Sequence, residues 1–215
     1  MTKYISFLLM LITGSAIGQS TIWDKWDPEV IARANTAADF EYYSDEEKKV
    51  VFFMNLARLD GALFAETILD EYVESDGTPN NSYLRSLYRD LQKTEGLPLL
   101  LPEEDLTSIA QGHATLAGKT GHTGHKNFNK RFEPFLGNPY NNVAENCSYG
   151  HAQAIDIVIT LLIDDGVKNL GHRLNTLNPE FNSVGVAIRE HSRFRVNCVI
   201  DFGKQSRSNL NNVPF

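Results

Sequence analysis

The chain has 215 residues, of which 42% are hydrophobic and 22% are charged, and its formal net charge is −7. This length suits one domain with its own core, since domains commonly contain about 50–250 residues. An acidic chain lacks the basic footprint that nucleic acid or an anionic membrane surface requires, so we expect neither of them as a partner.

The first 18 residues have the pattern of an export signal. Lys3 gives a positive start, residues 4–12 form an apolar run, and small residues around Ala16 follow. The run is shorter than the roughly 20 apolar residues that a spanning helix needs. We therefore expect a cleaved signal peptide over residues 1–18, no transmembrane anchor, and a secreted or periplasmic protein. Removing one lysine would change the net charge from −7 to −8.

Three regions are expected in the mature chain. Residues 19–44 form a polar lead-in, residues 45–203 form the domain, and residues 204–215, which are rich in Ser and Asn, form a loose tail. The domain contains both cysteines of the chain, Cys147 and Cys198. Because exported proteins meet oxidising conditions, we expect these two thiols to form a disulfide.

The domain begins with a strong helix signal. Ser44 is followed three residues later by Glu47, which is the capping-box pattern. From Val50 to Tyr72 apolar residues recur at spacings of three and four, and we expect one helix that Gly61 weakens without breaking. Further stretches with helical spacing cover residues 82–93, 103–118 and 152–163.

The period changes near the C-terminus. Apolar residues alternate with other residues over 184–188 and again over 194–202, and residues 189–193 between them suit a hairpin loop. Helices therefore come first and an antiparallel hairpin comes last. This order favours an α+β fold in which helices pack on the faces of an antiparallel sheet.

Three loop-like stretches concentrate imidazoles and carboxylates. The first contains His122 and His125, the second contains Glu145, and the third runs from Asp164 to His172. Such side chains bind divalent metals such as Zn²⁺ and also serve in general acid–base catalysis. Their spacing differs from H-E-x-x-H, which would place two ligands on one helical face, so spacing alone is a weak signal.

Other polar residues have simpler interpretations. His113 lies on the apolar face of an expected helix, which indicates a supporting histidine in the core. Arg131 and Arg173 suit loop bracing through pairs with Asp164, Asp165 or Glu145.

Several short motifs occur in a characteristic order. They are Asn55-Leu56-Ala57-Arg58, Ala110-Gln111-Gly112-His113-Ala114, Gly121-His122-Thr123-Gly124-His125 followed by Arg131, Ala144-Glu145-Asn146, Gly171-His172-Arg173-Leu174-Asn175 and Val184-Gly185-Val186-Ala187. In this order the chain resembles the CAP superfamily, the secreted domain of cysteine-rich secretory proteins, venom antigen 5 and plant pathogenesis-related proteins. The resemblance covers about residues 45–203 and is greatest to the bacterial, SCP-like branch.

The resemblance implies a three-layer α-β-α sandwich with a central antiparallel sheet and four site residues in a surface groove. His172 matches one family histidine, and Glu145 matches the acid of the family's Gly-Glu-Asn. Asp164 is the nearest match to the second acid, where animal members have Glu. The first histidine is His125 or His122, and we prefer His125 because the residues after it are similar to bacterial members.

Family members have been linked to divalent metals, to lipids or sterols and, in a few cases, to proteolysis, so the fold alone does not fix the function. We expect an extracellular binding module in which His125, His172, Glu145 and Asp164 hold Zn²⁺ or another divalent metal beside a peptide, lipid or glycan ligand. One alternative is a metal-assisted hydrolase with Glu145 or Asp164 as general base and His172 stabilising the oxyanion. The other is an interaction scaffold without a working cleft.

Overall fold

The structure, a computed structural model, describes residues 21–205. The expected signal peptide lies outside the described residues, and so do residues 206–215 of the expected tail. One four-stranded sheet has the order β1-β3-β4-β2, so β1 and β2 are its edges. The strands are β1 (Leu101–Pro102), β2 (Tyr140–Tyr149), β3 (Ser183–His191) and β4 (Arg195–Gln205).

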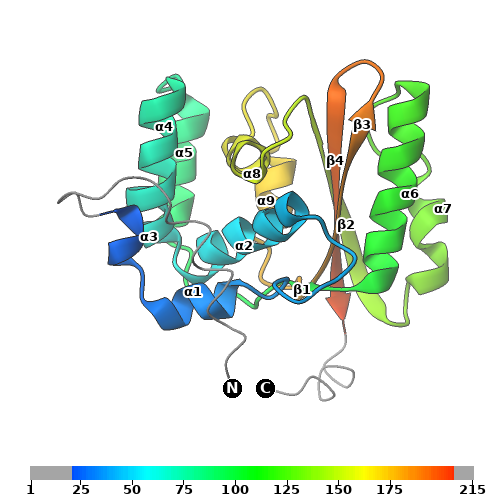
Figure 1. Cartoon of the computed structure of the whole chain (residues 1–215), viewed down its shortest axis with the longest axis horizontal. Coiled ribbons are helices and arrows are strands. Elements are labelled where there is room, and N and C mark those ends of the chain that lie inside the picture. Colours follow the sequence, from blue (N-terminus) through cyan, green and yellow to red (C-terminus); the bar gives the residue numbers. More distant parts are fainter. Residues whose placement is uncertain (1–20, 206–215) are drawn as a thin grey trace.

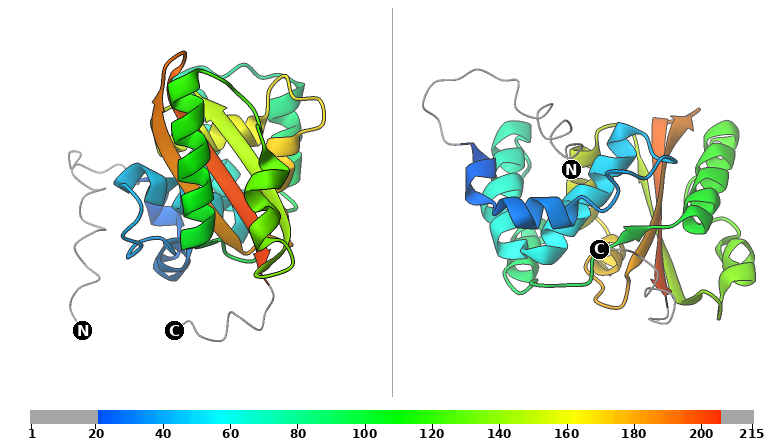
Figure 2. Two further views of the ribbon diagram at one scale, coloured as in Figure 1. Left: turned by 90° about the vertical axis from the view of Figure 1, so that its right-hand side faces the viewer. Right: turned by 60° about the horizontal axis from the view of Figure 1, so that its bottom comes forward.

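The sheet lies between two helical layers (Figure 1). One face is covered by α6 (Glu104–Thr120) and α7 (Phe128–Phe132), and Figure 2 shows α6 running across it. The other face carries α2 (Asp45–Leu59), α8 (Ala154–Ile163) and α9 (Gly171–Thr176). The expected three-layer sandwich is confirmed. The β2–β4 and β3–β4 pairs are antiparallel, and the short β1 adds a parallel pair with β3.

Further helical segments lie beyond the α2 layer (Figure 1). They are a 3-10 turn (Ile22–Lys25), α1 (Pro28–Ala34), α3 (Gly61–Phe64), a π-helical stretch (Ala65–Leu69), α4 (Asp70–Asp76) and α5 (Ser82–Leu91), while a second 3-10 turn (Glu133–Phe135) follows α7. The lead-in is thus helical, and it is joined to the core. Trp26 is buried and donates a hydrogen bond from Nε1 to Thr67 Oγ1 at 3.1 Å.

The first expected helix begins where the capping box predicts and ends earlier than expected. Ser44 and Glu47 form both reciprocal contacts of the capping box. The expectation that Gly61 would not break the helix is wrong, because α2 ends at Leu59 and the next residue, Asp60, has non-helical φ and ψ of −147° and 86°. A β-carbon on Gly61 would lie 2.4 Å from the carbonyl oxygen of Leu91. Gly61 therefore permits the close contact between this break and the end of α5.

Small residues bring α6 close to the sheet. A β-carbon on Gly185 of β3 would lie 2.1 Å from the carbonyl carbon of Leu106, and one on Gly118 of α6 would lie 2.0 Å from the carbonyl oxygen of Glu190. These glycines permit direct backbone contact between helix and strand. The layer beneath α6 is consequently thin, and it consists of small apolar clusters rather than one large core.

The expected disulfide is wrong. Cys147 of β2 lies opposite Val199, whereas Cys198 of β4 lies opposite Ser148. Because successive side chains of a strand point to opposite faces, the two cysteines lie on opposite faces of the sheet. Cys147 packs beneath α6, Cys198 belongs to the main core on the α2 side, and both are free thiols.

Within residues 21–205, none of the helices combines the length and apolar character that crossing a bilayer would require.

Candidate functional site

Strand β2 carries the acid of the Ala-Glu-Asn motif on an edge of the sheet. Glu145 points to the α6 face, because Cys147, two residues further along, packs beneath α6. Asn146 points to the other face and donates hydrogen bonds from Nδ2 to the His172 carbonyl oxygen and to Thr176 Oγ1. Glu145 and Asn146, adjacent on this edge strand, therefore belong to two separate polar clusters, one on each face of the sheet.

On the α6 face the Glu145 side chain is completely buried, and both of its oxygens contact His125 or Arg131. His125 Nδ1 lies 2.9 Å from its Oε1, Arg131 Nη2 donates to Oε1 at 2.9 Å, and Arg131 Nη1 lies 2.7 Å from Oε2. Burial would raise the pKa of Glu145, but the hydrogen bonds from His125 and Arg131 outweigh burial and lower it to about 2. Glu145 is therefore an ionised carboxylate that orients His125.

His113 and His122 lie behind this pair. His113 is buried on α6, donates from Nε2 to the Gly124 carbonyl oxygen at 2.9 Å, and lies 3.8 Å from Glu145 Oε1. His122 Nδ1 contacts Thr120 Oγ1 at 2.5 Å, and its ring centroid lies 5.7 Å from that of His113. Of the two candidate histidines, His125 is the one hydrogen-bonded to Glu145. His113 supports the loop, as its position on the apolar helix face predicts.

Asp164 and His172 form the second pair. Asp164 ends α8 in the left-handed conformation with φ of 58°, and its side chain is 1% exposed. Its Oδ1 lies 2.7 Å from His172 Nδ1, while its Oδ2 accepts from the backbone N–H of His172 at 2.9 Å and of Arg173 at 3.3 Å. One carboxylate thus accepts hydrogen bonds from N–H groups in the first turn of α9 and fixes the orientation of the His172 ring.

Arg173 fastens α9 to the rest of the protein. Its guanidinium is buried, donates to the carbonyl oxygens of Leu162 and Ile163, and forms an ion pair with Asp90 at 2.8 Å. Arg173 is therefore a brace, as expected, although its acidic partner is Asp90 of α5. The brace sets the position of His172, the residue before it.

The two pairs share a common design. In each, a buried carboxylate contacts Nδ1 of the ring, while the imidazole side chain stays partly exposed, at 48% for His125 and 24% for His172. The described residues give no hydrogen-bond partner to Nε2 of either ring. The pairs approach β2 from its two faces. We call His125, Glu145, Asp164 and His172 the edge site.

Two residues near Glu145 carry no signal in the sequence analysis as site residues. Asp201 of β4 lies directly opposite Glu145 and is fully buried, and burial together with the Glu145 carboxylate raises the pKa of Asp201 well above its usual range. Cys147 lies 3.8 Å from His125 Nδ1, and burial also raises its thiol pKa. Asp201 reaches Glu145 only through the register between β2 and β4, and Cys147 does so because residues two apart on a strand share a face.

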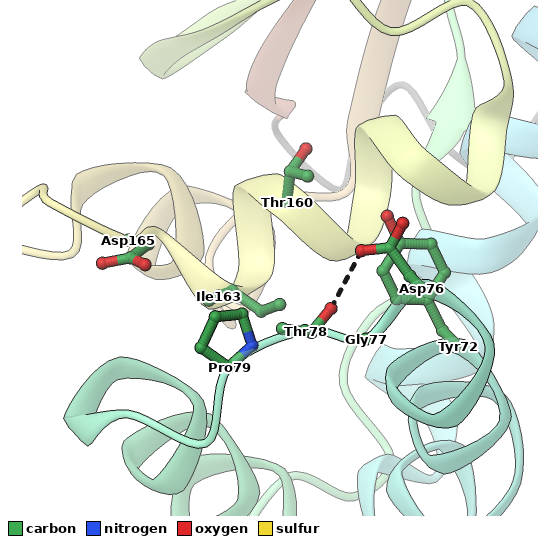
Figure 3. A pocket seen from close by; sticks show the side chains of 8 residues that line it. All are labelled: Tyr72, Asp76, Gly77, Thr78, Pro79, Thr160, Ile163 and Asp165. Atoms are coloured by element: carbon green, nitrogen blue, oxygen red, sulfur yellow. Dashed lines mark hydrogen bonds between the residues drawn. The ribbon is translucent and has the colours of Figure 1, made fainter.

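A cavity of about 350 Å³ lies elsewhere, between α4 and α8 (Figure 3). Tyr72 and Asp76 line one side, Thr160 and Ile163 line the other, and Asp165 lies at its end. The cavity includes none of the edge-site side chains, although Ile163 and Asp165 flank Asp164 in the chain.

Comparison with known families identifies the domain. A model of the cysteine-rich secretory protein family, CAP, matches residues 53–202. The chain belongs to this family. The match spans well over half of the chain and includes both pairs of the edge site, and it confirms the family resemblance of the ordered motifs. The curated protein sequences gave no match.

Solved structures with CAP-type domains are similar at low identity. An extracellular SCP-domain protein from Bacillus anthracis is 14% identical with a TM-score of 0.46, covering 84% of this chain and 44% of its own. An outer surface protein from Borrelia burgdorferi is 18% identical with a TM-score of 0.44, covering 60% and 97%. A cysteine-rich secretory protein from Staphylococcus aureus is 19% identical with a TM-score of 0.39, covering 59% and 41%. The CAP domain described here thus spans less than half of the first and third relatives.

Proposed function

We propose that this CAP protein is an exported binding module in which His125 and His172 hold a divalent metal ion such as Zn²⁺ at the edge of β2. The observation that carries the proposal is the matched pairing of each ring's Nδ1 with a buried carboxylate. Metal-binding histidines commonly donate one ring N–H to a carboxylate, which fixes the tautomer and leaves the other nitrogen for the metal. On this proposal Nε2 of each ring is the ligand atom, while Glu145 and Asp164 orient the rings.

The residues fit a zinc ion in their chemistry. Neutral imidazole nitrogens are good zinc ligands, and a catalytic or ligand-binding zinc keeps positions open for water or for another molecule. An ion held by two imidazoles at a sheet edge would leave such positions open. The extracellular ligand would then be a peptide, lipid or glycan that supplies an oxygen to the metal.

The hydrolase alternative receives less support from the geometry. A general base works best when its pKa lies near the working pH, and the pKa of Glu145 is about 2. The adjacent candidates for a nucleophile, Cys147 and Ser148, are buried, and burial raises the pKa of the Cys147 thiol. A thiol that remains protonated is a poor nucleophile. We therefore favour binding over catalysis.

The test is isothermal calorimetry of Zn²⁺ binding to the purified protein and to three variants. His125→Ala and His172→Ala should each weaken binding by about tenfold or more, whereas His151→Ala, a loop histidine outside the edge site, should not. Lowering the pH should also weaken binding, because imidazole ligands must be neutral. Wild-type affinity in both alanine variants, with unchanged melting temperatures, would rule out the metal edge site and favour a scaffold role.

A further inference from the structure

A second set of metal-binding groups lies behind the edge site, between β2 and α6. Ligand atoms of His113, Glu145 and Cys147 all lie within 4.8 Å of one another, and all three residues are buried. His113 comes from α6, whereas Glu145 and Cys147 are neighbours on one face of β2. The set contains an imidazole, a carboxylate and a thiol, which are the three ligand types that Zn²⁺ takes from proteins.

The measured separations approach those of a metal centre. With zinc bonds of about 2.0–2.3 Å, tetrahedral ligand atoms lie roughly 3.3–3.6 Å apart. His113 Nε2 is 3.8 Å from Glu145 Oε1, so this pair would need to close by a few tenths of an ångström. The Cys147 ligand atom lies within 4.8 Å of the ligand atoms of both other residues.

The surroundings of this set are unusually polar for a buried layer. Asp201 lies opposite Glu145, is fully buried, and accepts no hydrogen bond from an N–H or O–H donor of the described residues. Burial and the Glu145 carboxylate raise the pKa of Asp201, and burial raises the pKa of the Cys147 thiol, so Glu145, which pairs with Arg131, is the anion of this set. A divalent ion that displaced the Cys147 proton would supply the positive charge that a buried thiolate beside Glu145 requires.

The existing hydrogen bonds of Glu145 and His113 allow a metal ion to bind. A carboxylate has about four lone-pair positions, so Glu145 can accept from Arg131 and still bind a metal. His113 Nε2 would have to leave the carbonyl oxygen of Gly124, which belongs to a loop with φ of 82° and open space around its α-carbon. The exposed His125 lies next to this loop, which gives an ion a path from the surface.

We propose that His113, Glu145 and Cys147 form a thiolate-containing site for a soft divalent ion such as Zn²⁺ or Co²⁺, separate from the imidazole Nε2 atoms of the edge site. We call it the thiol site. Binding breaks the S–H bond of Cys147, the proton leaves to solvent, and the sulfur lone pair binds the metal. No electron transfer is involved. The thiol site shares Glu145 with the edge site but does not need His172.

The test uses Co²⁺, because thiolate coordination gives a charge-transfer absorption band in the near ultraviolet that imidazole and carboxylate ligands do not give. Titrating reduced wild-type protein with Co²⁺ should produce this band. It should disappear in Cys147→Ser and remain in Cys198→Ser, which removes the other buried thiol from the opposite face of the sheet. His113→Gln should weaken Co²⁺ binding by about tenfold or more.

The same spectrum separates the two proposals. In His172→Ala the band should persist, even if all binding at the edge site is lost. Absence of the band in wild-type protein would overturn the thiol site, and so would its persistence in Cys147→Ser. If circular dichroism shows that Cys147→Ser does not fold, Cys198→Ser decides, because Cys147 is then the one remaining thiol: retention of the band assigns it to Cys147, and its loss overturns the proposal.

Discussion

Cys147 and Cys198 lie on adjacent antiparallel strands, one residue out of register, and this offset places their side chains on opposite faces of the sheet. Cys147 faces α6, and Cys198 faces the main core. A disulfide links side chains whose β-carbons are about 4 Å apart and point toward each other. Two cysteines on opposite faces cannot meet this requirement without a slip in register.

The first prediction is therefore that the purified protein contains two free thiols. Thiol titration in denaturant without reductant should count two per chain, and a reducing agent should leave the melting temperature unchanged. A native disulfide in a protein of this size would instead contribute about 2–5 kcal/mol. A fall in melting temperature on reduction would show that the strands pair in a different register.

The sequence predicts regular elements well where burial follows a simple period. The capping box at Ser44 marks the start of α2 directly. The amphipathic α5 and the β3–β4 hairpin each bury one face, so their apolar residues recur with the period of a helix or a strand. The sequence does not predict β2 (Tyr140–Tyr149), because Glu145 and Asn146 occupy buried positions in it. Polar residues buried for their contacts break the alternation that identifies a strand.

The candidate site was predictable only in part. Motif order identified His125, Glu145, Asp164 and His172, and the structure joins them as two pairs. Their division between the two faces of β2 depends on strand register and on the anchoring of α9, which are long-range properties that residue spacing does not encode. Asp201 is invisible in the sequence for the same reason, because it meets Glu145 only through the β2–β4 register.

A second prediction concerns the buried ion pair of Glu145 and Arg131. Glu145→Gln would leave the guanidinium, whose side chain is 17% exposed, without its carboxylate partner. Breaking a buried pair from one side is strongly destabilising, and we expect a loss of about 2–3 kcal/mol in unfolding free energy, measured with urea at pH 7. Glu133→Gln, at an exposed acid nearby, is the control and should change stability by less than about 0.5 kcal/mol. Equal effects in the two variants would contradict the importance of the pair.

A third prediction separates the two roles of Asp164. Asn tolerates the left-handed backbone at φ of 58°, so Asp164→Asn removes the charge and one acceptor without adding strain. The start of α9 then loses a carboxylate cap, and we expect a cost of about 1 kcal/mol. Zinc affinity should fall together with stability, because His172 loses its orienting partner. Asp165→Asn, at the exposed neighbour, should alter neither quantity, and a matching loss there would argue against a specific role for Asp164.

A fourth prediction uses two glycines with opposite surroundings. Gly185→Ala would place a β-carbon 2.1 Å from the Leu106 carbonyl carbon, so α6 would have to move away from β3. Overpacking of this kind costs about 1–3 kcal/mol, and the value here should lie at or above the upper end. Gly112→Ala, on α6 itself and with open space around it, should instead stabilise the protein by about 0.5–1 kcal/mol through helix propensity. Urea unfolding of the two variants should give opposite signs, and the same sign in both would contradict the close packing of α6.

The last prediction concerns pH and Glu103, the residue before α6. Burial and the neighbouring Asp105 raise the pKa of Glu103 from 4.5 to about 7. Because the folded-state pKa exceeds the unfolded value, the folded protein binds more protons between these limits. The contribution of Glu103 to stability is therefore complete below about pH 4.5 and is lost as the pH rises to about 7.

Replacing this carboxyl by an amide should remove its share of the pH dependence. Glu103→Gln should be more stable than wild type at pH 8, by about 1 kcal/mol after allowance for solvent screening, and should approach wild-type stability near pH 4.5. Urea unfolding at several pH values checks this, with Glu66→Gln at an exposed helical position as the control. A stability difference that does not grow between pH 4.5 and pH 7 would contradict the raised pKa, because only a proton bound more tightly in the folded state makes the two curves diverge in that range.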